Sequence, residues 1–161
     1  MEILAKIDTE RLRPAVQPEP VKPCTIILVD DDPDDRHFAM EAFKRSEKVK
    51  DVLPLPDGED LIGYLKERGF YDRSVLCFNP ILILLDLQMP RLNGFETLAK
   101  IKYDPFLKEV PVIVLTTLTD TRKIFEAMSL GADGYLNKPL DFKKLEGFLA
   151  RGWSWPPQEM W

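Results

Sequence analysis

The stretch "PILILLD" at residues 80–86 decides the fold class, because five apolar residues follow one another and an aspartate ends the run. An uninterrupted apolar run of this length is typical of a strand that is buried on both faces, as in a parallel sheet covered by helices. The segments "TIILV" (25–29) and "PVIVLTT" (111–117) have the same character. These three segments predict the centre of a parallel sheet.

Two further strands and five helices complete the predicted pattern. "DVLPLP" (51–56) predicts an edge strand, since its prolines cannot donate ladder hydrogen bonds, and "GYLNKP" (134–139) predicts a fifth strand. A helix follows each strand: one to about residue 46, one ending near 69, one over about 95–103, one ending before 131, and one capped by Asp141. Strand and helix therefore alternate five times. This order predicts an α/β, three-layer, doubly wound fold with a central five-stranded parallel sheet.

Apolar residues at helical spacing give these helices their expected buried faces. Phe38, Ala39, Ala42 and Phe43 form such a set in the first helix. Ile124, Ala127 and Met128 form another in the fourth. We expect both sets to pack against the sheet.

Size and composition limit the function. The 161 residues, 45% of them hydrophobic, suit one globular domain. A net charge of -5 argues against nucleic acid as a partner, because no basic stripe is present to contact phosphates. No apolar run approaches the roughly 20 residues that span a bilayer, and the charged first residues do not resemble a signal peptide. We therefore expect a cytoplasmic protein without a membrane partner, in which Cys24 and Cys77 are unpaired.

The chain divides into three predicted parts. Residues 1–22 form a charged, proline-broken arm that we expect to be extended or flexible, and residues 23–150 form the domain. Residues 151–161 form a tail rich in tryptophan and proline. Its tryptophans either fold back onto their own domain or contribute to an interface, and the enrichment of aromatic residues at interfaces favours the second reading. We therefore expect no separate output domain at either end.

Polar side chains lie where four of the predicted strands end. They are Asp30 and Asp31, Asp86, Thr116 and Lys138. In a parallel α/β sheet the working site lies beyond the carboxyl ends of the strands. Carboxylates brought together there need a cation, and this hard oxygen set suits Mg²⁺ or another divalent ion such as Mn²⁺. A carboxylate beside Mg²⁺ can attack a phosphoryl group and become an aspartyl phosphate.

Four motifs in order give the chain a family resemblance. They are the acidic pair after "TIILV", "LLDLQMPRLNG" (84–94), "PVIVLTT" and "GADGYLNKP" (131–139). Over about residues 25–150 the chain resembles the CheY-like response regulator receiver domains of two-component systems. "VDDDPDD", "LKERGFYDRSVLCFNP" and "IKYDPFLKEVPVIVLTT" are most similar to stand-alone receivers associated with phytochromes. The resemblance implies a (βα)₅ flavodoxin-like fold that accepts phosphate from a histidine kinase.

The resemblance also implies a role for each residue that matches a family motif. Asp86 matches the phosphoacceptor. Asp30, Asp31, Asp86 and the backbone carbonyl of Gln88 match the groups that hold Mg²⁺. These roles predict a signalling phosphoprotein whose only catalysis is its own phosphorylation and dephosphorylation.

Three more residues match the family's switch. Thr116 matches the hydroxyl drawn to the phosphate, Lys138 the lysine that pairs with it, and Tyr135 the aromatic residue that changes rotamer. The family also implies a cis Lys138–Pro139 bond. Gln88 and the apolar Leu118 occupy positions that tune dephosphorylation, which we expect to be slow to intermediate.

The resemblance implies partners, and it leaves alternatives open. We expect a sensor histidine kinase, with a bacteriophytochrome as one candidate, and an unidentified downstream protein. A homodimer surface is expected to consist of the fourth predicted helix, the fifth strand, the fifth helix and the tail. One alternative is a haloacid-dehalogenase-type phosphatase that would use Asp30 and Asp32, although it leaves Asp86 unexplained. Another is a binding module that has lost phosphorylation.

The remaining aspartates of "LVDDDPDD" (28–35) are predicted to serve a helix. Asp32 is the expected N-cap of a helix that begins at Pro33. Asp34 and Asp35 then fall in the first turn, where each carboxylate favours the helix dipole by about 0.3–1 kcal/mol. We therefore expect neither of these two residues to take part in the chemistry.

Overall fold

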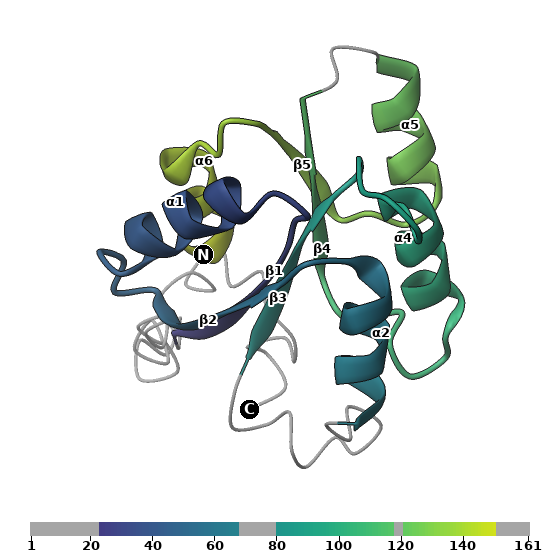
Figure 1. The fold of residues 1–161 in the computed structure, drawn as a ribbon, viewed down its shortest axis with the longest axis horizontal. Coiled ribbons are helices and arrows are strands. Elements are labelled where there is room, and N and C mark those ends of the chain that lie inside the picture. The colour runs from purple at the N-terminus through teal and green to yellow at the C-terminus, as the bar shows by residue number, and fades with distance from the viewer. Residues whose placement is uncertain (1–22, 68–79, 118–120, 151–161) are drawn as a thin grey trace, which may run out of the picture.

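The computed structural model describes residues 23–67, 80–117 and 121–150. The predictions for the arm, Cys77, Leu118 and the tail lie outside these residues. Ten elements alternate along the described chain, and each strand is followed by a helix. Figure 1 shows the strands in the middle of the molecule with helices on either side.

One five-stranded sheet forms the centre of the domain. Its strands lie in the order β2-β1-β3-β4-β5, and all neighbouring pairs are parallel. The strands are β1 (Cys24–Val29), β2 (Val49–Leu55), β3 (Ile81–Asp86), β4 (Val112–Thr116) and β5 (Gly134–Asn137). The predicted doubly wound, flavodoxin-like α/β fold is confirmed.

Helices cover both faces of the sheet. The helices α1 (Pro33–Phe43) and α6 (Phe142–Ala150) pack on one face. The other face is covered by α2 (Gly58–Glu67), α4 (Gly94–Tyr103) and α5 (Thr121–Ser129) (Figure 1). Alternate strand residues enter the two cores, so that Ile83 faces one core and Leu84 the other. This double coverage is the physical reason for the uninterrupted apolar runs.

The predicted edge strand is confirmed at β2, although it begins two residues before the predicted position 51. The extra pairing is visible in the register, where Val49 lies opposite Cys24. An irregularity follows directly, between Cys24 and Thr25. Val49 and Lys50, which precede "DVLPLP", form no alternating pattern from which this start could be predicted.

Two residues that were expected to pack against the sheet are exposed instead. Phe38 retains 62% of its surface, and Met128 retains 41%. Each precedes or follows a buried alanine, Ala39 and Ala127. Because successive helical residues are about 100° apart, a helix that buries these alanines turns the adjacent large side chain toward solvent. Helix α1 also ends at Phe43, before the predicted end near residue 46.

Gly94 fixes the contact between β3 and α4. A Cβ atom here would overlap the carbonyl oxygen of Asp86 and the Cα of Leu87. The helix begins at this glycine, and a capping box formed by Asn93 and Glu96 satisfies its first donors. The predicted turn therefore brings the start of α4 directly against the end of β3.

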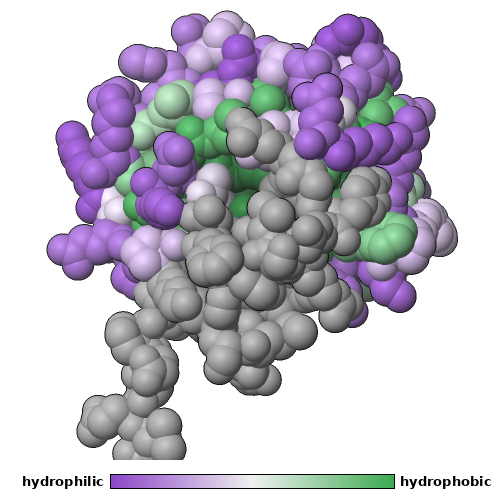
Figure 2. Space-filling view, turned by 90° about the horizontal axis from the view of Figure 1, so that it is seen from below, coloured by the Kyte–Doolittle hydropathy of each residue, from purple (hydrophilic) through white to green (hydrophobic). Residues whose placement is uncertain are grey.

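Hydrophilic side chains surround the described surface in the view from below, and hydrophobic ones gather near its centre (Figure 2). In the described ranges, no helix is both long and apolar enough to cross a bilayer. Cys24 is buried at the start of β1, and this burial raises the pKa of its thiol to about 12. It therefore behaves as a small apolar residue, as predicted.

Candidate functional site

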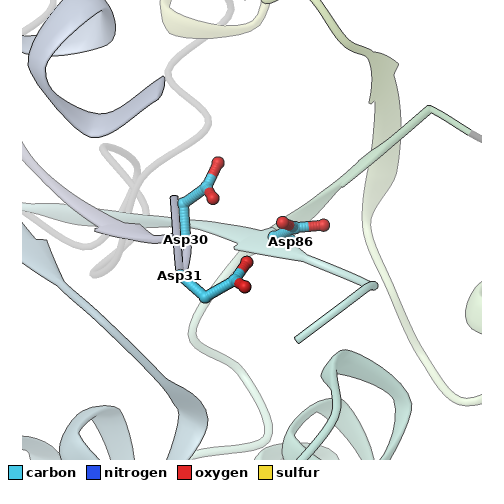
Figure 3. Close-up of side chains that lie close together, drawn as sticks. All are labelled: Asp30, Asp31 and Asp86. Carbon is cyan, nitrogen blue, oxygen red and sulfur yellow. The ribbon is translucent and has the colours of Figure 1, made fainter. Parts of the chain in front are cut away.

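The carboxyl ends of β1 and β3 place acidic residues side by side. Asp86 is the last residue of β3, and Asp30 directly follows β1. The two strands pair in register up to Val29 and Leu85, the residues that precede these aspartates. Figure 3 shows Asp30, Asp31 and Asp86 at these neighbouring strand ends.

Three carboxylates form a cluster that fits a divalent cation. One oxygen from each of Asp30, Asp31 and Asp86 lies within 4.8 Å of the others. Asp30 and Asp86 are buried, whereas Asp31 is exposed. Buried like charges repel one another unless a cation balances them, and oxygen ligands of this kind suit a hard ion that keeps some of its waters. The exposed side of the cluster leaves room for such waters and for a phosphate oxygen.

Main-chain donors orient the two buried carboxylates. The Gln88 N–H donates to Asp86 Oδ1 at 2.9 Å, and the Asp32 N–H donates to Asp30 Oδ1 at 2.9 Å. The second oxygen of each carboxylate faces Lys138. The loops after β1 and β3 therefore fix the rotation of both side chains.

Lys138 provides the cation within the site. Its Nζ lies 2.7 Å from Asp30 Oδ2, 3.0 Å from Asp86 Oδ2 and 3.0 Å from Asp35 Oδ2. Burial alone would lower the pKa of this lysine, but hydrogen bonds to the three carboxylates raise it above its usual value. The ammonium is therefore fully charged at neutral pH.

The surroundings of Asp86 make it an unusual carboxylate. Burial raises the pKa of Asp86 and the nearby Asp30 adds to this effect, whereas the Gln88 N–H and Lys138 lower it, and the net result is a pKa of about 6. At neutral pH the Asp86 carboxylate is ionised in most molecules, so it can act as a nucleophile. Its low exposure strengthens its interaction with any nearby positive charge.

Thr116 and Tyr135 lie on the two strands beyond β3. Thr116 is the buried last residue of β4, and its carbonyl accepts a hydrogen bond from the Lys138 N–H at 2.9 Å. This bond ties the end of β4 to the start of the loop that carries the lysine. Tyr135 on β5 is 44% exposed. The Lys138–Pro139 bond is cis, as predicted.

Gln88 extends from the loop after β3 with an exposed side chain. Its Oε1 accepts a hydrogen bond from the Thr117 hydroxyl at 3.2 Å. This contact links the segments that follow β3 and β4. The metal-binding role of the Gln88 carbonyl stays a prediction.

The acidic run after β1 separates largely as predicted. Asp32 is the N-cap of α1, and its carboxylate accepts from the Asp34 N–H at 2.8 Å and the Asp35 N–H at 3.4 Å. The prediction that Asp35 serves only the helix is wrong, because its side chain contacts Lys138. Sequence spacing does not reveal this pair, since 103 positions separate the two residues.

A second contact that the sequence did not reveal joins two loops at this edge of the sheet. The buried Asp57, which precedes α2, pairs with Arg91 in the loop between β3 and α4. Arg91 adopts a φ of 61°, which is uncommon for a residue other than glycine. Asp57 also accepts from the Asp60 N–H at 2.9 Å, so it anchors the start of α2 as well.

Comparisons with known proteins agree with this geometry. Residues 26–150 match the response regulator receiver domain family. The chain is 37% identical over 123 residues to the response regulator Rcp1 of Synechocystis sp., covering 76% of this chain and 82% of that protein. The chain therefore belongs to the response regulator receiver family.

Solved structures of relatives have the same fold. The Mn²⁺-bound form of Rcp1 is 34% identical with a TM-score of 0.61, covering 80% of this chain and 90% of that one. The phosphorylated cyanobacterial phytochrome response regulator RcpA is also 34% identical, with a TM-score of 0.64 over 81% of this chain and 94% of that one.

Membership of this family defines the chain as a phosphoacceptor signalling protein of the two-component type. The haloacid-dehalogenase alternative is wrong. It required Asp30 and Asp32 as a catalytic pair, but the Asp32 carboxylate is occupied as a helix cap. Receiver domains act in general as signalling modules rather than as enzymes on external substrates.

Proposed function

We propose that the chain accepts a phosphoryl group on Asp86 from the phosphohistidine of a sensor histidine kinase. The observation that carries this assignment is the position of the Asp86 carboxylate, which belongs to the acidic cluster and also contacts the Lys138 ammonium. A carboxylate oxygen attacks phosphorus in line as the P–N bond breaks, and the electron pair of that bond leaves with the imidazole. The product is an acyl phosphate on Asp86.

The surrounding residues have separate tasks in this transfer. Lys138, already 3.0 Å from the Asp86 carboxylate, pairs with one oxygen of the incoming group. The Thr116 hydroxyl donates to another, as the end of β4 lies beside β3. A Mg²⁺ ion held by Asp30, Asp31, Asp86 and the Gln88 carbonyl would neutralise charge that develops on the phosphoryl oxygens.

The direct test is chemical phosphorylation of the full chain. Incubation with phosphoramidate and Mg²⁺ is expected to label Asp86, with no label after omission of the metal or in Asp86→Asn. Asp34→Asn removes a nearby exposed charge and serves as the matched control, which is expected to be labelled normally. Label on Asp30, or wild-type protein that stays unlabelled, would overturn the assignment. Binding of beryllofluoride in the presence of Mg²⁺ is an independent measure of an intact site.

The identity of the metal and the kinase belongs to the same proposal. A divalent ion is supported by the acidic cluster and by the Mn²⁺-bound structure of Rcp1, and we infer that Mg²⁺ or Mn²⁺ serves here. The likeness to RcpA supports a phytochrome kinase as partner. Phosphotransfer from a panel of autophosphorylated kinases tests this. Preference for a kinase that is not a phytochrome would contradict the partner assignment while leaving the site intact.

The output surface is proposed to include α5, β5 and α6. Large side chains are exposed on the first two elements, namely Phe125, Met128 and Tyr135. A cavity of about 490 Å³ is lined by Tyr135 on β5 and by Lys143 and Phe148 on α6, among others. We infer that a partner protein or a second copy of the chain binds here. Sedimentation with and without beryllofluoride, compared between wild type and Phe125→Ser, tests for the homodimer.

A further inference from the structure

We propose that Asp35 is a positioning residue, which keeps the Lys138 ammonium beside Asp86 when a metal ion occupies the acidic cluster. This inference rests on the proposed function of Asp86 as the phosphoacceptor. It concerns a residue on α1 that lies outside the three-carboxylate cluster.

The contact joins two distant parts of the chain. Asp35 Oδ2 lies 3.0 Å from Lys138 Nζ, and Asp35 belongs to the first turn of α1 whereas Lys138 follows β5. The side chain of the lysine is only 14% exposed, although that of Asp35 is 51% exposed. An ion pair with one largely buried partner is screened less than a pair on the open surface.

The other two carboxylates that hold Lys138 have a second task. Asp30 and Asp86 both belong to the cluster that fits a divalent cation. A bound cation draws on their negative charge and also repels the ammonium. Asp35 is the remaining carboxylate on the lysine, and its charge is not shared with the cluster. It therefore retains Lys138 at the moment when the phosphoryl group arrives.

Free space lies beside the Lys138 side chain. A cavity of about 40 Å³ lies beside it, lined by Asp35, Phe38, Lys138 and Pro139 among others. Without the Asp35 carboxylate, the ammonium has one fewer partner, and the adjoining space allows the long side chain to shift away from Asp86. A displacement of about 1 Å in a reacting constellation is enough to slow a reaction by up to roughly 100-fold.

Asp34 is a matched control for Asp35. Both are exposed aspartates in the first turn of α1, so both favour the helix dipole in the same way. In the described part of the chain, the contact with Lys138 belongs to Asp35 and not to Asp34. Asp34→Asn and Asp35→Asn therefore remove the same charge from the same turn.

The experiment measures the rate of Asp86 phosphorylation by phosphoramidate at saturating Mg²⁺ in the full chain. We expect Asp35→Asn to lower the maximal rate constant by about 3–10-fold relative to Asp34→Asn, with little change in the Mg²⁺ concentration for half-saturation. Asp35→Glu restores a carboxylate and is expected to recover much of the rate. In a Lys138→Met background, Asp35→Asn and Asp34→Asn are expected to have equal effects.

Three results would overturn the inference. They are equal rates for Asp35→Asn and Asp34→Asn, a loss that higher Mg²⁺ concentrations restore, and the same loss from Asp35→Asn after Lys138 has been removed. The midpoint of urea unfolding, measured for each variant, separates loss of fold from loss of positioning. Wild-type protein that is not labelled on Asp86 would contradict the proposed function instead. The two failures are therefore distinguishable.

Discussion

Two largely buried lysines lie at opposite ends of the strands, and they differ in the charges that surround them. Lys102, near the end of α4, lies at the amino ends of β4 and β5, where its Nζ is 2.9 Å from Asp133 Oδ2 and 2.8 Å from the Val110 carbonyl. Lys138 lies at the carboxyl ends of the strands and contacts three carboxylates. The side chains of both lysines are mostly buried, at 9% and 14% exposure.

The difference between them is charge balance. At the amino ends of the strands, the Lys102 ammonium contacts one carboxylate, that of Asp133. The Val112 N–H donates to the same carboxylate at 2.8 Å. At the carboxyl ends, the Lys138 ammonium contacts Asp30, Asp35 and Asp86, and Asp31 lies beside them. The first group is neutral and complete, whereas the second has excess negative charge. Excess negative charge at a buried site favours the binding of a cation, whereas a balanced ion pair needs no ligand and has a structural role.

The largest effect is expected from Asp31→Asn. Asp31 is the exposed member of the cluster, so its loss removes a proposed metal ligand and leaves the core intact. We expect Mg²⁺-dependent phosphorylation to fall by at least about 100-fold, while the free energy of unfolding changes by less than about 0.5 kcal/mol. The phosphorylation rate is measured with phosphoramidate, and the free energy of unfolding is measured by urea titration. If Asp31→Asn lost both activity and stability, the acidic cluster would have a structural role, like the pair of Lys102 and Asp133.

The opposite result is expected at Lys102. Lys102→Met leaves the Asp133 carboxylate and two carbonyl oxygens without this donor, so we expect a loss of about 2–4 kcal/mol in the free energy of unfolding. Mg²⁺ affinity should stay unchanged. Lys100→Met, an exposed lysine of the same helix, is the control and should have little effect. Equal stability of the two variants would contradict the structural role.

Asp86→Asn is expected to stabilise the metal-free protein at pH 7. The pKa of Asp86 is raised to about 6, so the folded protein binds more protons than the unfolded chain between about pH 4 and pH 6. Wild-type stability from this group therefore falls as pH rises through that window. The neutral amide avoids this loss, by about 1–3 kcal/mol at pH 7, and has no advantage below pH 4. Urea unfolding at several pH values, with Asp34→Asn as control, measures the difference, and Mg²⁺ should reduce it.

The smallest effect is expected from Arg91→Ala. Asp57 is buried, but its partner Arg91 is 63% exposed, so solvent screens the pair. We expect a loss of about 1–2 kcal/mol in the free energy of unfolding, since water can reach the abandoned carboxylate only in part. Arg91→Lys keeps a positive charge and should lose less. A thermal midpoint unchanged in Arg91→Ala would show that the two loops are held together by other contacts.

The sequence was most informative where one strong physical pattern acted alone. The apolar runs of β1, β3 and β4 predicted a sheet covered on both faces, and the strand ends predicted the meeting of Asp30, Asp31 and Asp86. The cap at Asp32 followed from local chemistry. These features depend on neighbours in the chain or on the common direction of parallel strands.

Contacts between distant side chains could not be predicted in this way. The pair formed by Asp35 and Lys138 depends on how α1 is placed over the sheet, and Asp57 and Arg91 meet only because two loops converge. The exposure of Phe38 has a similar origin, because the helix rotates to bury Ala39. Helical spacing predicts that an apolar face exists, but tertiary packing determines which residues at its margin are covered.

The proline in the edge strand β2 has a consequence for association. The Leu55 carbonyl accepts from the Asp30 N–H at 3.1 Å, so the main chain at Leu55 faces β1, and at the preceding Pro54 it faces outward. Proline has no N–H, and an incoming strand would find a donor missing at this point. The opposite edge is the four-residue strand β5. Both edges thus discourage the main-chain strand addition that leads to aggregation. Contacts of this signalling domain with other proteins are therefore expected to use side chains, such as the exposed Tyr135 of β5, and not strand pairing.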